Sequence, residues 1–263
     1  MAIVRILIVL AALFSPASAR AVEIVSHRGN ACGYTENSIE AIHRSWVLGV
    51  DAIEVDVRVS TDDIVFLYHD DLVEDQPVKD MKYTDLVEIV GLKASPTLQS
   101  VLESVEPKGQ YILDLKPPWI NDYNHLVDIV RDNNIDPSLL VFQSDNVDLL
   151  KLIREELPTS KYLYLSDLKR KLPFFMAPSP NQILKEVIQH NLDGVSLKGR
   201  KFITKKFVNE FRSLELTVFI WTINNLDRAK FYTEISVDGI ITDSSEKFVQ
   251  AFSDERFNGQ GCN

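Results

Sequence analysis

The chain has very few cysteines, no excess of basic residues, and no long hydrophobic run beyond its first residues. Its 263 residues include only two cysteines, and its formal net charge is −10. This acidic balance argues against a general nucleic-acid-binding protein and against simple electrostatic docking on anionic membranes. The sequence contains no Cys/His spacing typical of zinc sites, and no glycine-rich dinucleotide fingerprint follows its first predicted strand.

The N-terminal residues differ in composition from the rest of the chain. A short basic region, residues 1–5, precedes an apolar region, 6–14, and a run of small residues. This pattern predicts a secretory signal peptide over residues 1–21, cleaved after Ala19 or Ala21. The apolar region is too short to span a bilayer comfortably, and no second run of spanning length follows. We therefore expect an exported protein, periplasmic or secreted, whose mature chain has no transmembrane segment.

The two cysteines are far apart in the sequence. Cys32 follows the first predicted strand, and Cys262 is the penultimate residue. Export to an oxidising compartment permits a disulfide between them, which would hold the C-terminal tail against the loop after the first strand. Two unpaired thiols are the alternative, because the sequence gives no geometry.

The strongest local pattern lies in residues 51–70. From Ile53 to Val57, β-branched side chains alternate with Glu54 and Asp56, so the two carboxylates share one face of a strand. Like charges this close cost free energy unless a cation or protons relieve them, which favours a site for a hard divalent metal. A surface strand with a solvated polar face is the alternative interpretation.

The segment after this strand predicts a hairpin. Residues 60–63 are too few to cross over to a parallel strand, so residues 64–68 should return antiparallel and bring His69 beside the carboxylates. A histidine beside a metal can be a ligand or a general acid/base. Because the neighbouring ligand groups are oxygens, we favour the acid/base role.

Strand and helix patterns then alternate to the end of the chain. Further strand-like runs are predicted at 111–115, 139–142, 162–165, 194–197, 217–222 and 239–242, with helical patterns between them. Together with 22–26 and the Glu54 strand they make eight parallel candidates. This pattern predicts an α/β fold, a (β/α)₈ TIM barrel with an antiparallel strand and a short excursion after strand two, as one domain over residues 22–263. A doubly wound open sheet is the alternative.

A barrel gathers polar residues at the C-terminal ends of its strands. The residues that we expect there are three carboxylates, two histidines and two fixed cations: Glu54, Asp56, Asp114, His27, His69, Arg28 and Lys116. Carboxylate oxygens suit Ca²⁺ or Mg²⁺, and the cations suit a phosphate. The set indicates metal-assisted cleavage of a phosphate ester. As a structural alternative, Arg28 pairs with Asp56 and Lys116 with Asp114 as simple salt bridges, and His69 is a hydrogen-bonded turn residue.

Several motifs, in order, resemble those of the glycerophosphodiester phosphodiesterase family, in the phospholipase C-like phosphodiesterase barrel superfamily. They are His27-Arg28-Gly29, Thr35-Glu36-Asn37-Ser38, Glu54-Val55-Asp56, His69-Asp70, Pro96-Thr97-Leu98, Asp114-Leu115-Lys116, Trp221-Thr222-Ile223-Asn224 and residues 238–243. The resemblance implies a barrel that hydrolyses glycerophosphodiesters to glycerol 3-phosphate and an alcohol with a divalent metal. It implies that His27 and His69 are the acid/base pair and that Glu54, Asp56 and Asp114 are the metal ligands. Arg28 and Lys116 would contact the phosphate, and Trp221 and Asn224 are further candidates for substrate contacts.

The sequence departs from the family pattern at three places. Asp114 stands where the family usually has Glu, Thr35 where it has Pro, and Glu74-Asp75 where Arg-Thr-Thr is common. The Asp114-Leu115-Lys116 motif also resembles the related sphingomyelinase D group. A phospholipase D-like activity on lysophospholipids or sphingomyelin is therefore one alternative function, and a non-catalytic binding barrel is another. The sequence leaves the oligomeric state open.

Overall fold

The elements of the chain alternate between strands and helices. The computed structural model describes residues 21–30, 33–91, 95–117, 123–168 and 180–252. Its strands are β1 (Glu23–Ser26), β2 (Ala52–Val59), β3 (Val65–Leu67), β4 (Leu72–Val73), β5 (Gln76–Pro77), β6 (Gln110–Leu115), β7 (Leu140–Ser144), β8 (Lys161–Ser166), β9 (Gly194–Lys198), β10 (Thr217–Trp221) and β11 (Gly239–Thr242). Its α-helices are α1 (Ile39–Leu48), α2 (Tyr83–Val90), α3 (Leu98–Ser104), α4 (Tyr123–Asp132), α5 (Val147–Glu156), α6 (Pro180–Gln189), α7 (Lys205–Arg212), α8 (Leu226–Glu234) and α9 (Ser245–Phe252).

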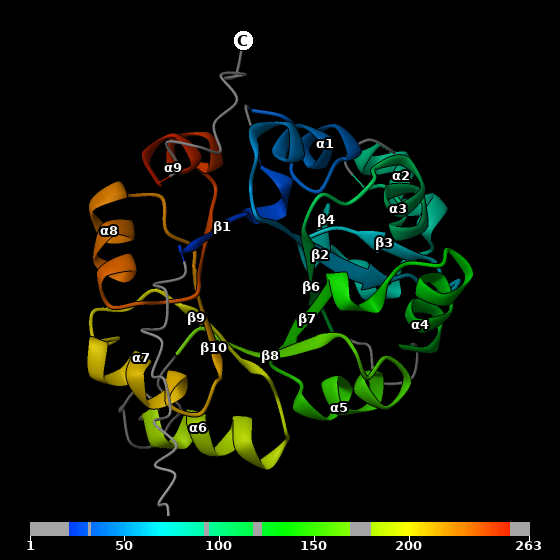
Figure 1. The fold of residues 1–263 in the computed structure, drawn as a ribbon. Coiled ribbons are helices and arrows are strands. Elements are labelled where there is room, and N and C mark those ends of the chain that lie inside the picture. The colour runs from blue at the N-terminus through cyan, green and yellow to red at the C-terminus, as the bar shows by residue number, and fades with distance from the viewer. Residues whose placement is uncertain (1–20, 31–32, 92–94, 118–122, 169–179, 253–263) are drawn as a thin grey trace, which may run out of the picture.

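The main sheet closes on itself. Its strand order is β1-β11-β10-β9-β8-β7-β6-β2-β3, and β1 also pairs with β2, so the first strand touches neighbours on both sides. All pairs are parallel except β2–β3, in which Val57 lies opposite Leu67. Helices surround this ring of strands (Figure 1). The fold is therefore the predicted (β/α)₈ TIM barrel with an antiparallel strand after β2, and the open-sheet alternative is wrong because the ring is closed.

Helix α1 illustrates how local sequence signals set the elements. Ser38 caps its first turn by accepting a hydrogen bond from the Ala41 amide, and Gly49 ends it in the left-handed conformation. Its apolar face is buried against the outside of the barrel. There Trp46 is 3 % exposed and donates its indole N–H to the Tyr111 hydroxyl at 3.2 Å. The signals at both ends of this helix are thus local to its sequence.

A layer of apolar side chains fills the inside of the barrel. These residues, one from each of seven strands, are Val25, Ala52, Ile112, Val141, Leu163, Phe219 and Ile241. Side chains two positions further along a strand point to the same side, so each strand's next inward residue lies one layer above this apolar floor. The sequence becomes polar at that step, as Ala52 is followed by Glu54 and Ile112 by Asp114.

The segment between β3 and α3 contains more regular structure than the sequence pattern predicts. Strands β4 and β5 form a small antiparallel sheet, and α2 follows them. Their buried residues form a separate small core around Phe66. The two strands were missed because a two-residue strand is too short to show a period. Residues 1–20, Cys32 and Cys262 lie outside the described residues, and with them the predicted signal peptide and disulfide.

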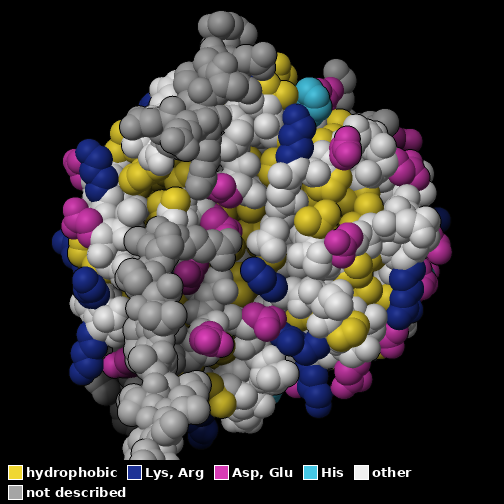
Figure 2. Space-filling view, in the orientation of Figure 1, with side chains coloured by type: hydrophobic (Ala, Val, Ile, Leu, Met, Phe, Trp, Pro, Cys, Tyr) yellow, Lys and Arg dark blue, Asp and Glu magenta, His cyan; other side chains and the backbone are white. Residues whose placement is uncertain are grey.

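Within the described residues, no helix combines the length and the apolar character that a membrane crossing requires. On the face of the molecule seen in Figure 2, acidic and basic side chains are interspersed, and hydrophobic side chains show between them. No large area of one charge is visible on the coloured part of that face.

Three aspartates tie neighbouring strands together at the N-terminal end of the barrel. Asp51, Asp193 and Asp238 each precede a strand, and one side-chain oxygen of each accepts the backbone N–H of a residue in the adjacent parallel strand, at 2.7–2.9 Å. The backbone N–H of the same aspartate donates to the carbonyl of that same residue. The three strand pairs β1–β2, β8–β9 and β10–β11 are therefore fixed in register below the apolar floor.

Replacing Asp238 with alanine should destabilise the barrel without changing its chemistry. The Val218 N–H loses its side-chain acceptor, and a partly buried amide without a partner costs roughly 1–3 kcal/mol. Asp238→Asn keeps an acceptor and is the matched control. Urea unfolding should show a lower midpoint for the alanine variant only, and equal stability of the two variants would contradict this role.

Candidate active site

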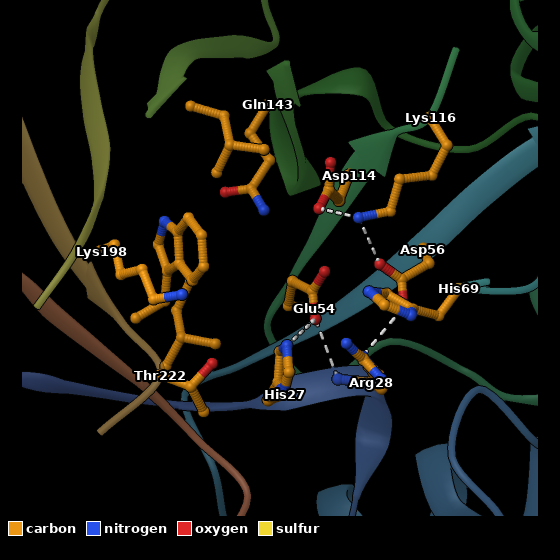
Figure 3. A pocket seen from close by; sticks show the side chains of 13 residues that line it. His27, Arg28, Glu54, Asp56, His69, Asp114, Lys116, Gln143, Lys198 and Thr222 are labelled. Atoms are coloured by element: carbon orange, nitrogen blue, oxygen red, sulfur yellow. Dashed lines mark hydrogen bonds and ion pairs between the residues drawn. The ribbon is translucent and has the colours of Figure 1, made fainter. Parts of the chain in front are cut away.

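The polar layer above the apolar floor lines one cavity at the C-terminal end of the barrel. Its volume is about 340 Å³. The residues around it are His27, Arg28, Glu54, Asp56, His69, Asp114, Lys116, Gln143, Leu165, Lys198, Trp221, Thr222 and Ile241. The strand ends thus bring together all of the predicted site residues among the described ones, except Asn224 (Figure 3).

Three buried carboxylates form the wall made by β2 and β6. Glu54, Asp56 and Asp114 are 2 %, 1 % and 6 % exposed, and one oxygen of each lies within 4.8 Å of the others. Asp56 and Asp114 are in register on the adjacent strands. The spacing suits oxygen ligands around one ion, because Ca²⁺ takes its ligands at 2.3–2.6 Å.

The electrostatics of these carboxylates also fit a cation. Burial, with the charge of Asp56 adding to it, raises the pKa of Glu54 to about 8. Burial likewise raises the pKa of Asp114, against the opposing effect of Lys116. The Asp114 Oδ1 atom is buried and has no hydrogen-bond partner within the described structure. The cluster is therefore short of positive charge, and a divalent ion held by these three residues would supply it.

Two fixed cations, Arg28 and Lys116, compensate the charge of Asp56. Burial acts to raise the pKa of Asp56, but Lys116 and Arg28 outweigh it and lower that pKa. The Lys116 ammonium lies 2.9 Å from Asp56 Oδ1 and 2.7 Å from Asp114 Oδ2, and the Arg28 Nε lies 3.1 Å from Asp56 Oδ2. The salt bridges of the structural alternative are thus present. They also place both cations at the edge of the cavity, so they do not exclude contact with a phosphate.

Local backbone geometry directs Arg28 toward this cluster. The residue follows β1 in a short 3₁₀ turn and has a left-handed backbone, with φ of 55°. In this turn its N–H donates to Glu54 Oε2 at 2.9 Å. Asn37 also holds Asp56 in place. Its side-chain amide donates to Asp56 Oδ2, and its side-chain oxygen accepts the Asp56 N–H, both at 3.0 Å.

Each of the two histidines in the cavity is paired with an aspartate through its Nδ1 atom. His27 Nδ1 lies 2.5 Å from Asp243 Oδ1, and His69 Nδ1 lies 2.8 Å from Asp70 Oδ1. An Nδ1 engaged in this way leaves Nε2 as the atom that exchanges protons. His27 Nε2 lies 3.9 Å from Glu54 Oε2, so this atom faces the carboxylates. His69 therefore makes the hydrogen bond to Asp70 that the structural alternative expected, and it also lines the cavity.

Asp243 fixes both the orientation and the charge of His27. Burial acts to lower the pKa of His27, but the hydrogen bond to Asp243 and the charge of Glu54 outweigh it and raise that pKa. Asn224 donates to the second oxygen of Asp243 at 2.7 Å and accepts the Asp243 N–H at 2.9 Å. Asn224 therefore contacts Asp243 and does not line the cavity, and its substrate contact stays a prediction.

Arg58 anchors the loop that carries His69. It is the next inward residue of β2 after Asp56, and it is 4 % exposed. Its guanidinium donates to the carbonyl of Tyr68 at 3.1 Å, to the carbonyl of His69 at 2.7 Å and to Asp71 Oδ1 at 2.6 Å. One rigid strand thereby holds both the carboxylates and the second histidine.

The sequence patterns assigned no role to several residues of this site. Arg58 continues the Glu54–Asp56 alternation by one more step, and that period was its only signal. Asn37 and Asp243 lie within motifs that the sequence analysis names, but their contacts join distant elements, so the motifs did not show what the two residues hold. Gln143 and Lys198 end predicted strands, so the barrel prediction already places them at this rim, and the structure shows that both line the cavity.

Comparison with known proteins places the chain in a family. The model of the glycerophosphoryl diester phosphodiesterase family matches residues 27–247. The chain belongs to this family. The match begins at His27 and ends after Asp243, so it spans every residue of the cavity described above.

Individual members of the family are distant in sequence. A glycerophosphodiester phosphodiesterase of Caldanaerobacter subterraneus is 24% identical over 86% of this chain and 96% of its own length. Human lysophospholipase D is 24% identical over 87% of this chain and 86% of its own. A crystal structure of glycerophosphodiester phosphodiesterase from Thermotoga maritima is 25% identical, covers 88% of this chain and 98% of its own, and has a TM-score of 0.72.

A solved structure with bound product has the same fold. This Oleispira antarctica phosphodiesterase, in complex with sn-glycerol-3-phosphate, has a TM-score of 0.73 at 20% identity and covers 88% of this chain and 96% of its own. At that identity the similarity shows the fold alone.

Replacing Arg58 with methionine should lower kcat more than it raises KM. The variant keeps the apolar length of the side chain but releases the two carbonyls beside His69, and misplacing a reacting group by about 1 Å costs on the order of 100-fold in rate. Steady-state kinetics checks this, with Asp71→Asn as a control that retains an acceptor for the guanidinium. Arg58→Lys should recover part of kcat, and a normal kcat in the methionine variant would contradict the anchoring role.

Binding of a divalent ion should weaken as the pH falls below about 8, the pKa of Glu54 without metal. An ion binds the ionised carboxylate, so below that pKa it must displace a proton, and the affinity falls roughly tenfold per pH unit for one proton. Calorimetric titration with Ca²⁺ or Mg²⁺ at pH 6, 7 and 8, in buffers of different ionisation enthalpy, measures both effects. Binding without proton release at pH 7 would show that Glu54 is ionised beforehand.

Proposed function

We propose that the protein hydrolyses glycerophosphodiesters to glycerol 3-phosphate and an alcohol. The observation that carries the proposal is the cavity itself, where three buried carboxylates, two imidazole–aspartate pairs and two fixed cations meet. Hydrolysis of one phosphodiester group requires charge compensation at the phosphate and two proton transfers, and these groups together can supply both. Membership of the family and the names of its relatives support the same reaction.

Glu54, Asp56 and Asp114 would hold a divalent ion, which we propose to be Ca²⁺ or Mg²⁺. When bound, the ion withdraws negative charge from the phosphate oxygens. Arg28 and Lys116 stand beside the same carboxylates, so they also attract the non-bridging oxygens and orient the phosphate.

The two histidines divide the proton transfers. Hydrolysis forms a bond between water oxygen and phosphorus and breaks the bond between phosphorus and the alcohol oxygen. One imidazole removes a proton from the attacking water, while the other donates a proton to the departing alcohol oxygen. Asp243 and Asp70 hold the Nδ1 atoms of the pair, so each proton is exchanged at Nε2.

The place of action is part of the proposal. The N-terminal pattern supports export after removal of a signal peptide ending at Ala19 or Ala21, into a periplasm or out of the cell. The mass of the mature protein, purified from cells that express the full chain, tests this cleavage.

Purified mature protein should release glycerol 3-phosphate from a panel of glycerophosphodiesters. EDTA should abolish the release, and added Ca²⁺ or Mg²⁺ should restore it, because the carboxylate cluster repels the phosphate when it lacks an ion. Coupled detection of glycerol 3-phosphate measures the rate.

The control variants are His27→Ala and His69→Ala. Loss of a general acid or base lowers the rate by about 10²–10⁴-fold, and the fold should be retained. Near-normal rates in both variants would contradict the acid/base assignment. Turnover of lysophosphatidylcholine or sphingomyelin in place of glycerophosphodiesters would favour a phospholipase D-like activity, the function that the name of the human relative suggests. Failure with all of these compounds would favour a binding barrel.

A further inference from the structure

The wall opposite the carboxylates carries a different set of groups. In the closed ring, β9 is four strands from β2 in either direction, and β10 is four strands from β6. Lys198 ends β9 and Trp221 ends β10, in register with each other, and both line the cavity. Figure 3 shows Lys198 on the far side of the cavity from Lys116 and Asp114. A group attached to a phosphate at the carboxylates, and extending across the barrel, therefore meets this wall.

Lys198 differs from Arg28 and Lys116, the other two cations of the cavity, because it is not paired with a carboxylate of the described residues. Arg28 and Lys116 are each paired with carboxylates at 2.7–3.1 Å. Within the described residues, Lys198 has no carboxylate partner. Its ammonium instead lies over the Trp221 ring, with Nζ 5.5 Å from the ring centroid. Its positive charge is therefore available to a ligand.

Two further residues of the cavity have polar atoms available to a ligand: Trp221, which is next to Lys198 on β10, and Gln143, which is in register with Asp114 on β7. The Trp221 Nε1 donor and the Gln143 Oε1 acceptor are both buried, and neither has a hydrogen-bond partner within the described structure. Gln143 is 2 % exposed. A buried polar group without a partner is costly, so these atoms favour a ligand that carries hydroxyl groups. Hydroxyls can accept from Trp221 and Lys198 and donate to Gln143.

A quaternary ammonium group fits this wall poorly. Such cations bind the faces of aromatic rings, but Lys198 already occupies the neighbourhood of the Trp221 ring as a cation. Two positive charges on this wall would repel each other with little screening in a half-enclosed cavity.

We propose that Lys198 makes this site selective for glycerophosphodiesters whose alcohol is rich in hydroxyls or negatively charged, and selective against choline. The inference rests on the proposed function and names its substrate class. Lys198 acts as a specificity-determining residue in the wall opposite the metal ligands, with Trp221 and Gln143 as hydrogen-bonding partners of the same alcohol group.

The test compares kcat/KM for glycerophosphoinositol, glycerophosphoglycerol and glycerophosphocholine. The wild type should prefer the first two over the choline compound by about tenfold or more, the effect of one unscreened like charge nearby. Lys198→Met should lose most of this preference, mainly through a better KM for glycerophosphocholine. Lys198→Arg should retain it, which also shows that position 198 tolerates substitution. Lys201→Met, an exposed lysine of the same segment, is the matched control and should leave the ratio unchanged.

The outcomes separate this inference from the proposed function. An active enzyme whose substrate ratio is the same in the wild type and in Lys198→Met would overturn the selectivity alone, because Lys198 would then contact a part common to all substrates. A wild-type preference for the choline compound would also overturn it. Absence of turnover with all three diesters would overturn the proposed function, and the selectivity with it.

Discussion

The mutual repulsion of three buried carboxylates is the constraint on which the rest of the site depends. Glu54, Asp56 and Asp114 lie above an apolar floor, so little water reaches them to screen their charges. Two cations, Arg28 and Lys116, compensate the charge of Asp56 and lower its pKa. The pKa values of Glu54 and Asp114 remain raised. The same excess of negative charge would be relieved by a divalent ion bound to the three carboxylates.

The barrel divides its functions by depth. Aspartates at the N-terminal end fix strand register, and the apolar layer closes the interior. On β2, β6, β7, β8 and β10 the next inward residue lines the cavity. Successive inward side chains are two residues apart along a strand. A residue of the apolar core and a residue of the site can therefore lie only two positions apart. This arrangement explains how Ala52 of the apolar layer and the cavity-lining Glu54 belong to the same strand.

The fold and the centre of the site were predictable because their signals are local and repeated. The alternation around Glu54 and Asp56 and the eight strand-like runs follow from periods in the sequence, and the hairpin before His69 follows from a connection too short for a crossover. Arg58 and Asp243 were missed as functional residues because their roles depend on which carbonyl or imidazole the folded chain brings to them. The β4–β5 hairpin was missed because elements of two residues carry no period, and the role of Lys198 requires the ring to be closed.

The contact between His27 and Asp243 joins the first strand of the barrel to the last. Both residues directly follow strands, β1 and β11, that pair only when the sheet closes. On the ribosome, residue 27 emerges more than 200 residues before its partner, so no shorter nascent chain can orient this imidazole. The contact that orients His27 therefore forms only after nearly the whole barrel has been synthesised, and a chain that ends before β11 lacks the carboxylate that holds this imidazole.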